Sequence, residues 1–173
     1  MKVHNLLCSG PKMRTLLDDS KTQMRWPIML PHYNNPLGAW EPSTIGGGST
    51  IFSDGTPAAE RPCISHTRTG ETPTFPYGWI SDLILLHRDG RTPNIPVSTL
   101  EILDVRVERL QSISEADALA EGVKVAEKFL FTKYSKKHRP AAAAYARQWK
   151  TTCGADSWDA NPWVWAVEFR RLL

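Results

Sequence analysis

The most constraining feature of this sequence is the uneven distribution of its proline and glycine residues. Ten of the 13 prolines lie between Pro27 and Pro96, and eight of the 11 glycines lie between Gly38 and Gly90. Such a stretch cannot sustain helical periodicity, because glycine loses much backbone entropy in a helix and proline lacks an amide donor. We therefore predict that residues 31–80 form a long loop-rich insertion with room for a short hairpin, while the flanking segments carry the fold.

Size and composition place the chain among globular proteins. Its 173 residues suit one domain, and a hydrophobic content of 41% is enough for one core, which excludes a fully disordered chain. The net charge of +3 is too small to require a polyanionic partner. Three cysteines fit a reducing compartment, and no apolar run has the roughly 20 residues of a membrane helix. We expect one cytoplasmic domain over residues 1–173, with no membrane contact and no cofactor.

The flanking segments alternate between strand-like and helix-like patterns. Short apolar runs predict strands over residues 6–9, 22–29, 81–87, 99–110 and 163–172. The fourth of these strands should bulge near Leu103, where the apolar positions change face. Helices are expected after Pro11 and after Ser114, a suitable N-cap, and residues 124–150 look helical with an interruption at Pro140. This pattern predicts an α+β fold, a small β-barrel decorated by short helices.

A polar run between the first helix and the second strand offers candidate binding groups. The segment Ser20–Arg25 supplies an amine, a hydroxyl, an amide and a guanidinium, which together suit a phosphate or the polar edge of a base. In a strand, Lys21, Gln23 and Arg25 would share one face. The alternative interpretation is a solvated edge strand whose charges face water.

Several sequence blocks occur in an order that is typical of one protein family. The blocks are Ser9–Leu17, Lys21–Arg25, His66–Gly70, Pro76–Gly78, Leu100–Ile102, Val105–Gln111, Ile113–Ala118, Trp158–Trp165 and Val167–Phe169. Together they resemble the ASCH-domain family, most of all the branch carried by bacteriophages and prophages. The resemblance implies a PUA-like β-barrel, a fold associated with the binding of RNA or modified nucleosides.

Some ASCH proteins hydrolyse the amide of an acylated cytidine, and others cleave single-stranded RNA. The resemblance implies catalytic roles for Lys21 and Glu121, whereas the family's threonine falls on Met24 in this chain. A thioether can neither attack an amide nor relay a proton, so Thr22 or an ordered water is the expected replacement. On this hypothesis, a threonine at position 24 should raise hydrolysis.

Glu121 also stands out without the resemblance. It follows the apolar stripe of a short predicted helix, where the helix dipole disfavours an acidic side chain. A residue that opposes its local preference indicates a role elsewhere, such as pairing with Lys21. The alternative is an ordinary surface glutamate near a helix end.

A basic stretch precedes the last strand. Residues 129–150 contain no acidic residue, and lysines and arginines alternate there with aromatic residues, as on nucleic-acid surfaces. The alternative is a solvated helix whose Tyr145 and Trp149 form the buried side. We expect Lys136 and Lys137 to bind ligand, together with three residues of the N-terminal blocks, namely Ser9, Gln23 and Arg25.

The sequence leaves three functional hypotheses open. Cys63 and His66 have the spacing of a zinc pair, but no second pair accompanies them, so no metal is expected. The first hypothesis is a phage-type ASCH protein that binds RNA or a modified nucleoside and is a hydrolase with an impaired site. The second is an RNA-binding module without catalysis. The third is a virus-encoded protein that binds a host protein through residues 31–80.

Overall fold

The computed structural model describes residues 1–8, 10–30, 39–45, 61–73, 75–88, 95–125 and 139–172. Within this part of the chain, five strands form one mixed sheet in the order β1-β5-β6-β7-β2. The first pair is parallel, and the other three pairs are antiparallel. The strands are β1 (Val3–Cys8), β2 (Gln23–Pro27), β5 (Leu83–Arg88), β6 (Ser98–Arg109) and β7 (Trp163–Leu172).

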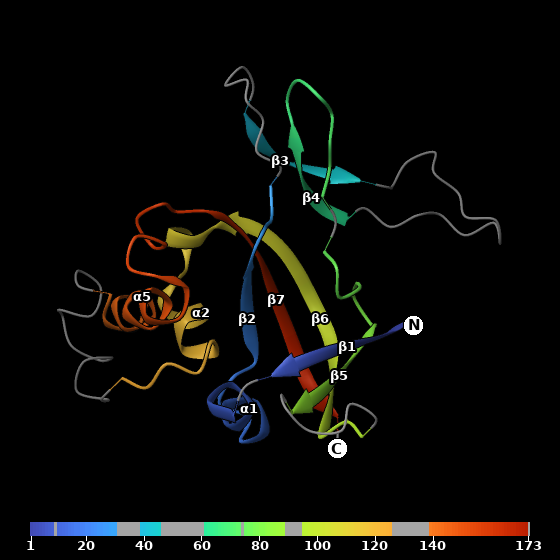
Figure 1. Ribbon diagram of the computed structural model, residues 1–173, viewed down its shortest axis with the longest axis vertical. Coiled ribbons are helices and arrows are strands. Elements are labelled where there is room, and N and C mark those ends of the chain that lie inside the picture. Colours follow the sequence, from blue (N-terminus) through green and yellow to red (C-terminus); the bar gives the residue numbers. More distant parts are fainter. Residues whose placement is uncertain are drawn as a thin grey trace.

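The sheet curls into a half-barrel around which the helices are arranged (Figure 1). A register shift between Ile102 and Asp104 marks the predicted bulge, which leaves Leu103 43% exposed next to the buried Ile102. Among the described residues, the edge strands β1 and β2 do not pair with each other, so the sheet stops short of a closed barrel. A curled sheet with few helices agrees with the α+β prediction and is consistent with a PUA-like fold.

Local sequence signals set the helix boundaries. The helices are α1 (Gly10–Leu17), a 3₁₀ turn η1 (Leu110–Ser112), α2 (Glu115–Ala120) and α5 (Pro140–Cys153). Ser114 caps α2 as predicted, since its hydroxyl accepts from the Asp117 amide at 3.0 Å and the Asp117 carboxylate accepts from the Ser114 amide. Pro140 opens α5, and the helical stretch expected before it falls mostly on residues 126–138, which lie outside the described residues.

The insertion contains the expected short hairpin. Strands β3 (Trp40–Ile45) and β4 (Arg61–His66) pair antiparallel and lie beyond one end of the half-barrel (Figure 1). The Trp40 and His66 rings pack against each other at a tilt of 60°, with centroids 5.0 Å apart. Residues 31–38, 46–60 and 74 lie outside the described residues, so a loop-rich insertion over the rest of this range stays a prediction.

Two apolar clusters hold the elements together. The larger lies on one face of the sheet and includes Met24, which is only 1% exposed. The smaller packs α2 and α5 together and includes Tyr145 and Trp149, so these two rings form the buried side of α5. Within the described residues, no helix is long and apolar enough to span a bilayer.

Candidate functional site

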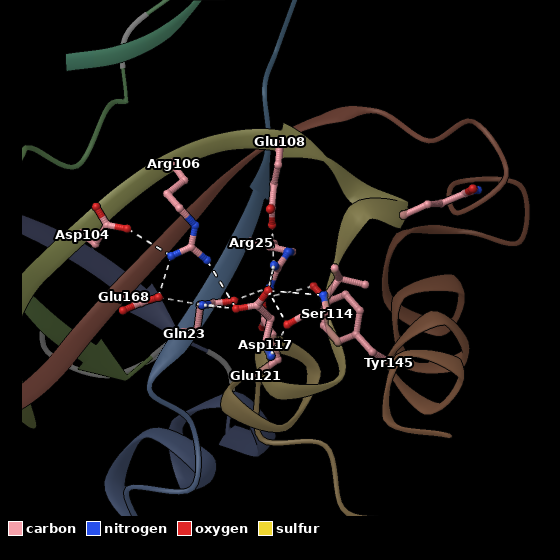
Figure 2. A network of polar contacts seen from close by, with 12 residues as sticks. Gln23, Arg25, Asp104, Arg106, Glu108, Ser114, Asp117, Glu121, Tyr145 and Glu168 are labelled. Atoms are coloured by element: carbon pink, nitrogen blue, oxygen red, sulfur yellow. Dashed lines mark hydrogen bonds and ion pairs between the residues drawn. The ribbon is translucent and has the colours of Figure 1, made fainter. Parts of the chain in front are cut away.

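The polar run of the N-terminal segment is buried. Lys21, Gln23 and Arg25 are 6%, 2% and 4% exposed, respectively. They lie on alternate positions in and just before β2, opposite the face that carries Met24. The interpretation as a solvated edge strand is therefore wrong: β2 is an edge strand, but α2 and α5 cover its polar face, and the three side chains meet partners there (Figure 2).

Lys21 and Glu121 form a buried ion pair, as one sequence interpretation predicted. The Lys21 ammonium contacts the Glu121 carboxylate and also donates to the Glu121 carbonyl oxygen at 3.0 Å. Glu121 is 3% exposed, which contradicts the alternative of a surface glutamate. Gly122 allows this approach, because it adopts a φ of +83° and a Cβ at this position would lie 3.2 Å from the Lys21 Cβ.

Arg25 is the centre of the cluster. Its guanidinium donates to Glu121 at 3.3 Å, contacts the Glu108 carboxylate of β6, and lies 3.5 Å from an oxygen of Asp117 in α2. The Arg25 side chain is fully buried, and its Nε is among the buried polar atoms that have no hydrogen-bond partner within the described structure. A buried cation of this kind persists only when several carboxylates compensate its lost hydration.

Gln23 joins the buried centre to a more exposed edge. Its amide nitrogen donates to Asp117 at 3.0 Å and to Glu168 of β7 at 3.2 Å. Arg106 of β6 in turn bonds Glu168 and Asp104 (Figure 2). We call the carboxylates of Glu108, Asp117 and Glu168 the rim of the cluster, because their side chains are 20%, 23% and 42% exposed.

Tyr145 closes the cluster from the side of α5. Its hydroxyl donates to the Glu121 carboxylate at 3.3 Å. Burial, followed by the charge of Glu121, raises the pKa of Tyr145 far above its ordinary value. The phenol therefore stays a neutral donor toward the Glu121 carboxylate.

The cluster carries an excess of negative charge. Its cations are the side chains of Lys21, Arg25 and Arg106, and its carboxylates are those of Asp104, Glu108, Asp117, Glu121 and Glu168. With three cations against five carboxylates, the exposed rim repels phosphates and attracts hydrogen-bond donors.

The pKa of Asp117 makes the cluster sensitive to acid. Burial acts to raise this pKa, but hydrogen bonds from Gln23 and Ser114 and the charge of Arg25 outweigh it, so the pKa is lowered. As the pH falls, the unfolded chain binds a proton at this carboxylate before the folded protein does. The stabilisation from Asp117 is therefore complete above about pH 4 and is lost as the pH falls below that value.

We expect the free energy of unfolding of the wild-type protein to fall more steeply than that of Asp117→Asn below about pH 4. Urea titrations of both proteins at about pH 3 and about pH 6 measure the difference. Parallel losses in the two proteins would show that Asp117 does not contribute.

Four other residues were expected at the site, namely Thr22, Ser9, Lys136 and Lys137. Thr22 is exposed, in contrast to the buried Lys21, Gln23 and Arg25, and its backbone bonds Ala120 and Phe169. Ser9, Lys136 and Lys137 lie outside the described residues. Their roles stay predictions.

Sequence reasoning missed the rim and Tyr145 as parts of the site. A signal was present, because Arg106 and Glu108 alternate with the apolar residues of β6 and Glu168 alternates with those of β7. One polar face across three adjacent strands becomes evident only when the strand order is known. For metals, no group of three or more His, Cys, Asp or Glu that could hold an ion occurs within the described ranges.

The chain matches no protein-family model and no curated protein. An ASCH domain from Lactobacillus crispatus with a solved structure is similar, at 12% sequence identity and a TM-score of 0.45, over 98% of this chain and 79% of that chain. The sequence blocks resemble the same family, but at this identity and TM-score the likeness assigns neither family nor function. Function has to be inferred from the polar cluster itself.

Proposed function

We propose that the polar cluster binds the amine-bearing edge of a neutral nucleobase, with cytidine as the preferred nucleoside. The observation that carries this proposal is the rim, where Asp117 and Glu168 are accessible carboxylates that Gln23 holds at defined positions. A carboxylate accepts hydrogen bonds from the exocyclic amine of cytosine. The excess of negative charge favours a neutral ligand over a phosphate at this place.

Cytidine and uridine form a matched pair of ligands for the test. Uridine has a carbonyl oxygen where cytidine has the amine. In uridine, this oxygen would face the carboxylate oxygens of the rim, and two acceptors cannot form a hydrogen bond with each other. Calorimetric titration should show that cytidine binds more tightly by about tenfold to more than a hundredfold. Asp117→Asn should remove most of this preference, because an amide can donate as well as accept.

The control is Asp156→Asn, which removes the same charge from an exposed position outside the cluster. It should keep the preference for cytidine. Equal binding of the two nucleosides by the wild-type protein, or a preference that survives in Asp117→Asn, would overturn the proposal.

Hydrolysis of an acylated cytidine is a second candidate function, favoured by the contact between Lys21 and Glu121. In this reaction, water adds to the acyl carbon and the carbon–nitrogen bond breaks, which releases a carboxylic acid and cytidine. Glu121 would take a proton from the water, and the Lys21 ammonium would supply one to the departing nitrogen.

N4-acetylcytidine is the substrate for this test. Lys21→Ala and Glu121→Gln should each lower the hydrolysis rate by about a hundredfold or more. An inactive wild-type protein that still prefers cytidine would reject hydrolysis and retain the binding function. We also propose that the chain belongs to the phage-borne branch of the ASCH family, a relationship that the sequence blocks at both ends of the chain support.

A further inference from the structure

A groove on the outer side of α5 lies apart from the polar cluster. It has a volume of about 450 Å³, and the small side chains of α5 leave it open. Its other wall is the turn that follows α5, beginning at Gly154 with a φ of +105°. Two contacts hold Trp158 in this turn. Its carbonyl oxygen accepts a hydrogen bond from the side-chain amide of Gln111 at 2.9 Å, and its ring makes an edge contact with the ring of Tyr145.

The charge of the groove is opposite to that of the polar cluster. Arg139, Arg147 and Lys150 line it, against the single carboxylate of Asp159. The Arg139 guanidinium also donates to the Ile113 carbonyl oxygen, a neutral partner that leaves its positive charge uncompensated. Lys150 and Asp159 form an exposed ion pair at 2.7 Å, of a kind worth little in water, so the ammonium is free to exchange partners. Among the described residues, Arg147 has no carboxylate partner.

From this arrangement we infer that the groove binds single-stranded RNA through its phosphates, with a base stacked on Trp158. The cations from Arg139 to Lys150 extend over about 16 Å along α5. A single phosphate cannot reach all of them, whereas a strand with several phosphates can. The Trp158 ring adds a stacking surface that an acidic peptide would not use, and bases stack on aromatic side chains with little regard to sequence. The inference goes beyond nucleoside binding and does not depend on it.

The test uses a labelled oligouridylate of about 12 nucleotides, because uridine is the base that the polar cluster should not prefer. Fluorescence anisotropy measures its affinity for the full chain as the salt concentration is varied. Three phosphate contacts predict a logarithmic slope of about −2, so affinity should fall about 20-fold between about 50 and about 200 mM salt. Failure of cytidine binding would leave this result unchanged.

Variants place the binding in the groove. Arg147→Gln should weaken binding and lower the magnitude of the salt slope by about 0.7, whereas Asp159→Asn should strengthen binding severalfold because it releases Lys150. Arg170→Gln is the matched control, since Arg170 is exposed and pairs with Glu101 away from the groove. Unchanged affinity in both Arg147→Gln and Lys150→Gln, or no binding at about 50 mM salt, would overturn the proposal. Equal displacement by oligoglutamate would also overturn it, in favour of an acidic protein partner.

Discussion

Replacing Arg25 by alanine should lower the free energy of unfolding by about 3–5 kcal/mol. The Arg25 side chain is fully buried and is the shared partner of Glu108, Asp117 and Glu121. Its removal leaves these carboxylates close together with Lys21 as the main compensating charge. The penalty of an uncompensated buried charge then adds to the lost hydrogen bonds. Urea denaturation of the variant and the wild-type protein measures the loss.

Arg106→Ala is the matched control for this experiment. Arg106 also bonds carboxylates, but its side chain is 35% exposed and its partner Glu168 is 42% exposed. Solvent replaces much of the lost interaction at such a site, so we expect a loss of about 1 kcal/mol or less. Arg25→Lys should recover only part of the stability, because an ammonium lacks the planar fork that reaches several carboxylates. Equal losses in Arg25→Ala and Arg106→Ala would contradict the central position of Arg25.

The substitution Met24→Thr should destabilise the protein by about 2–5 kcal/mol and bring no gain in hydrolysis. Met24 is 1% exposed within the larger apolar cluster, on the opposite face of β2 from Gln23 and Arg25. A threonine there leaves a cavity and buries a hydroxyl, and its oxygen points away from the face that carries Lys21. The sequence-based expectation that this substitution would raise hydrolysis therefore does not follow from the structure.

Met24→Leu serves as the control, because a swap of similar volume should cost less than about 1.5 kcal/mol. Denaturation and hydrolysis of N4-acetylcytidine are measured on the same protein preparations. A Met24→Thr protein that is as stable as the wild type and hydrolyses faster would show that position 24 faces the site.

Much of the architecture was predictable because it depends on local signals. The cap at Ser114, the start of the first helix near Pro11 and the bulge near Leu103 all follow from backbone preferences that a few adjacent residues express. Glu121 could be suspected for a related reason, since an acid at that end of α2 opposes the helix dipole.

The rest of the site depends on contacts between distant segments. Gln23 and Glu168 are 145 positions apart, and Arg25 and Glu108 are 83 apart. Only the strand order β6-β7-β2 brings these residues onto one face. The net negative charge of the cluster could not be read from a chain whose overall charge is +3. Binding of a host protein through residues 31–80 remains a prediction that the described part of the insertion does not test.

The most direct test of the nucleobase site is the side-chain amide of Gln23, which bonds both Asp117 and Glu168. Its resonances can be followed by nitrogen-edited nuclear magnetic resonance while nucleoside is added. Binding at the rim predicts that cytidine shifts these resonances in a saturable manner, that uridine shifts them much less, and that the backbone amide of Arg147 in the groove stays unchanged. Equal shifts with both nucleosides, or shifts confined to the groove, would contradict nucleobase recognition by the polar cluster.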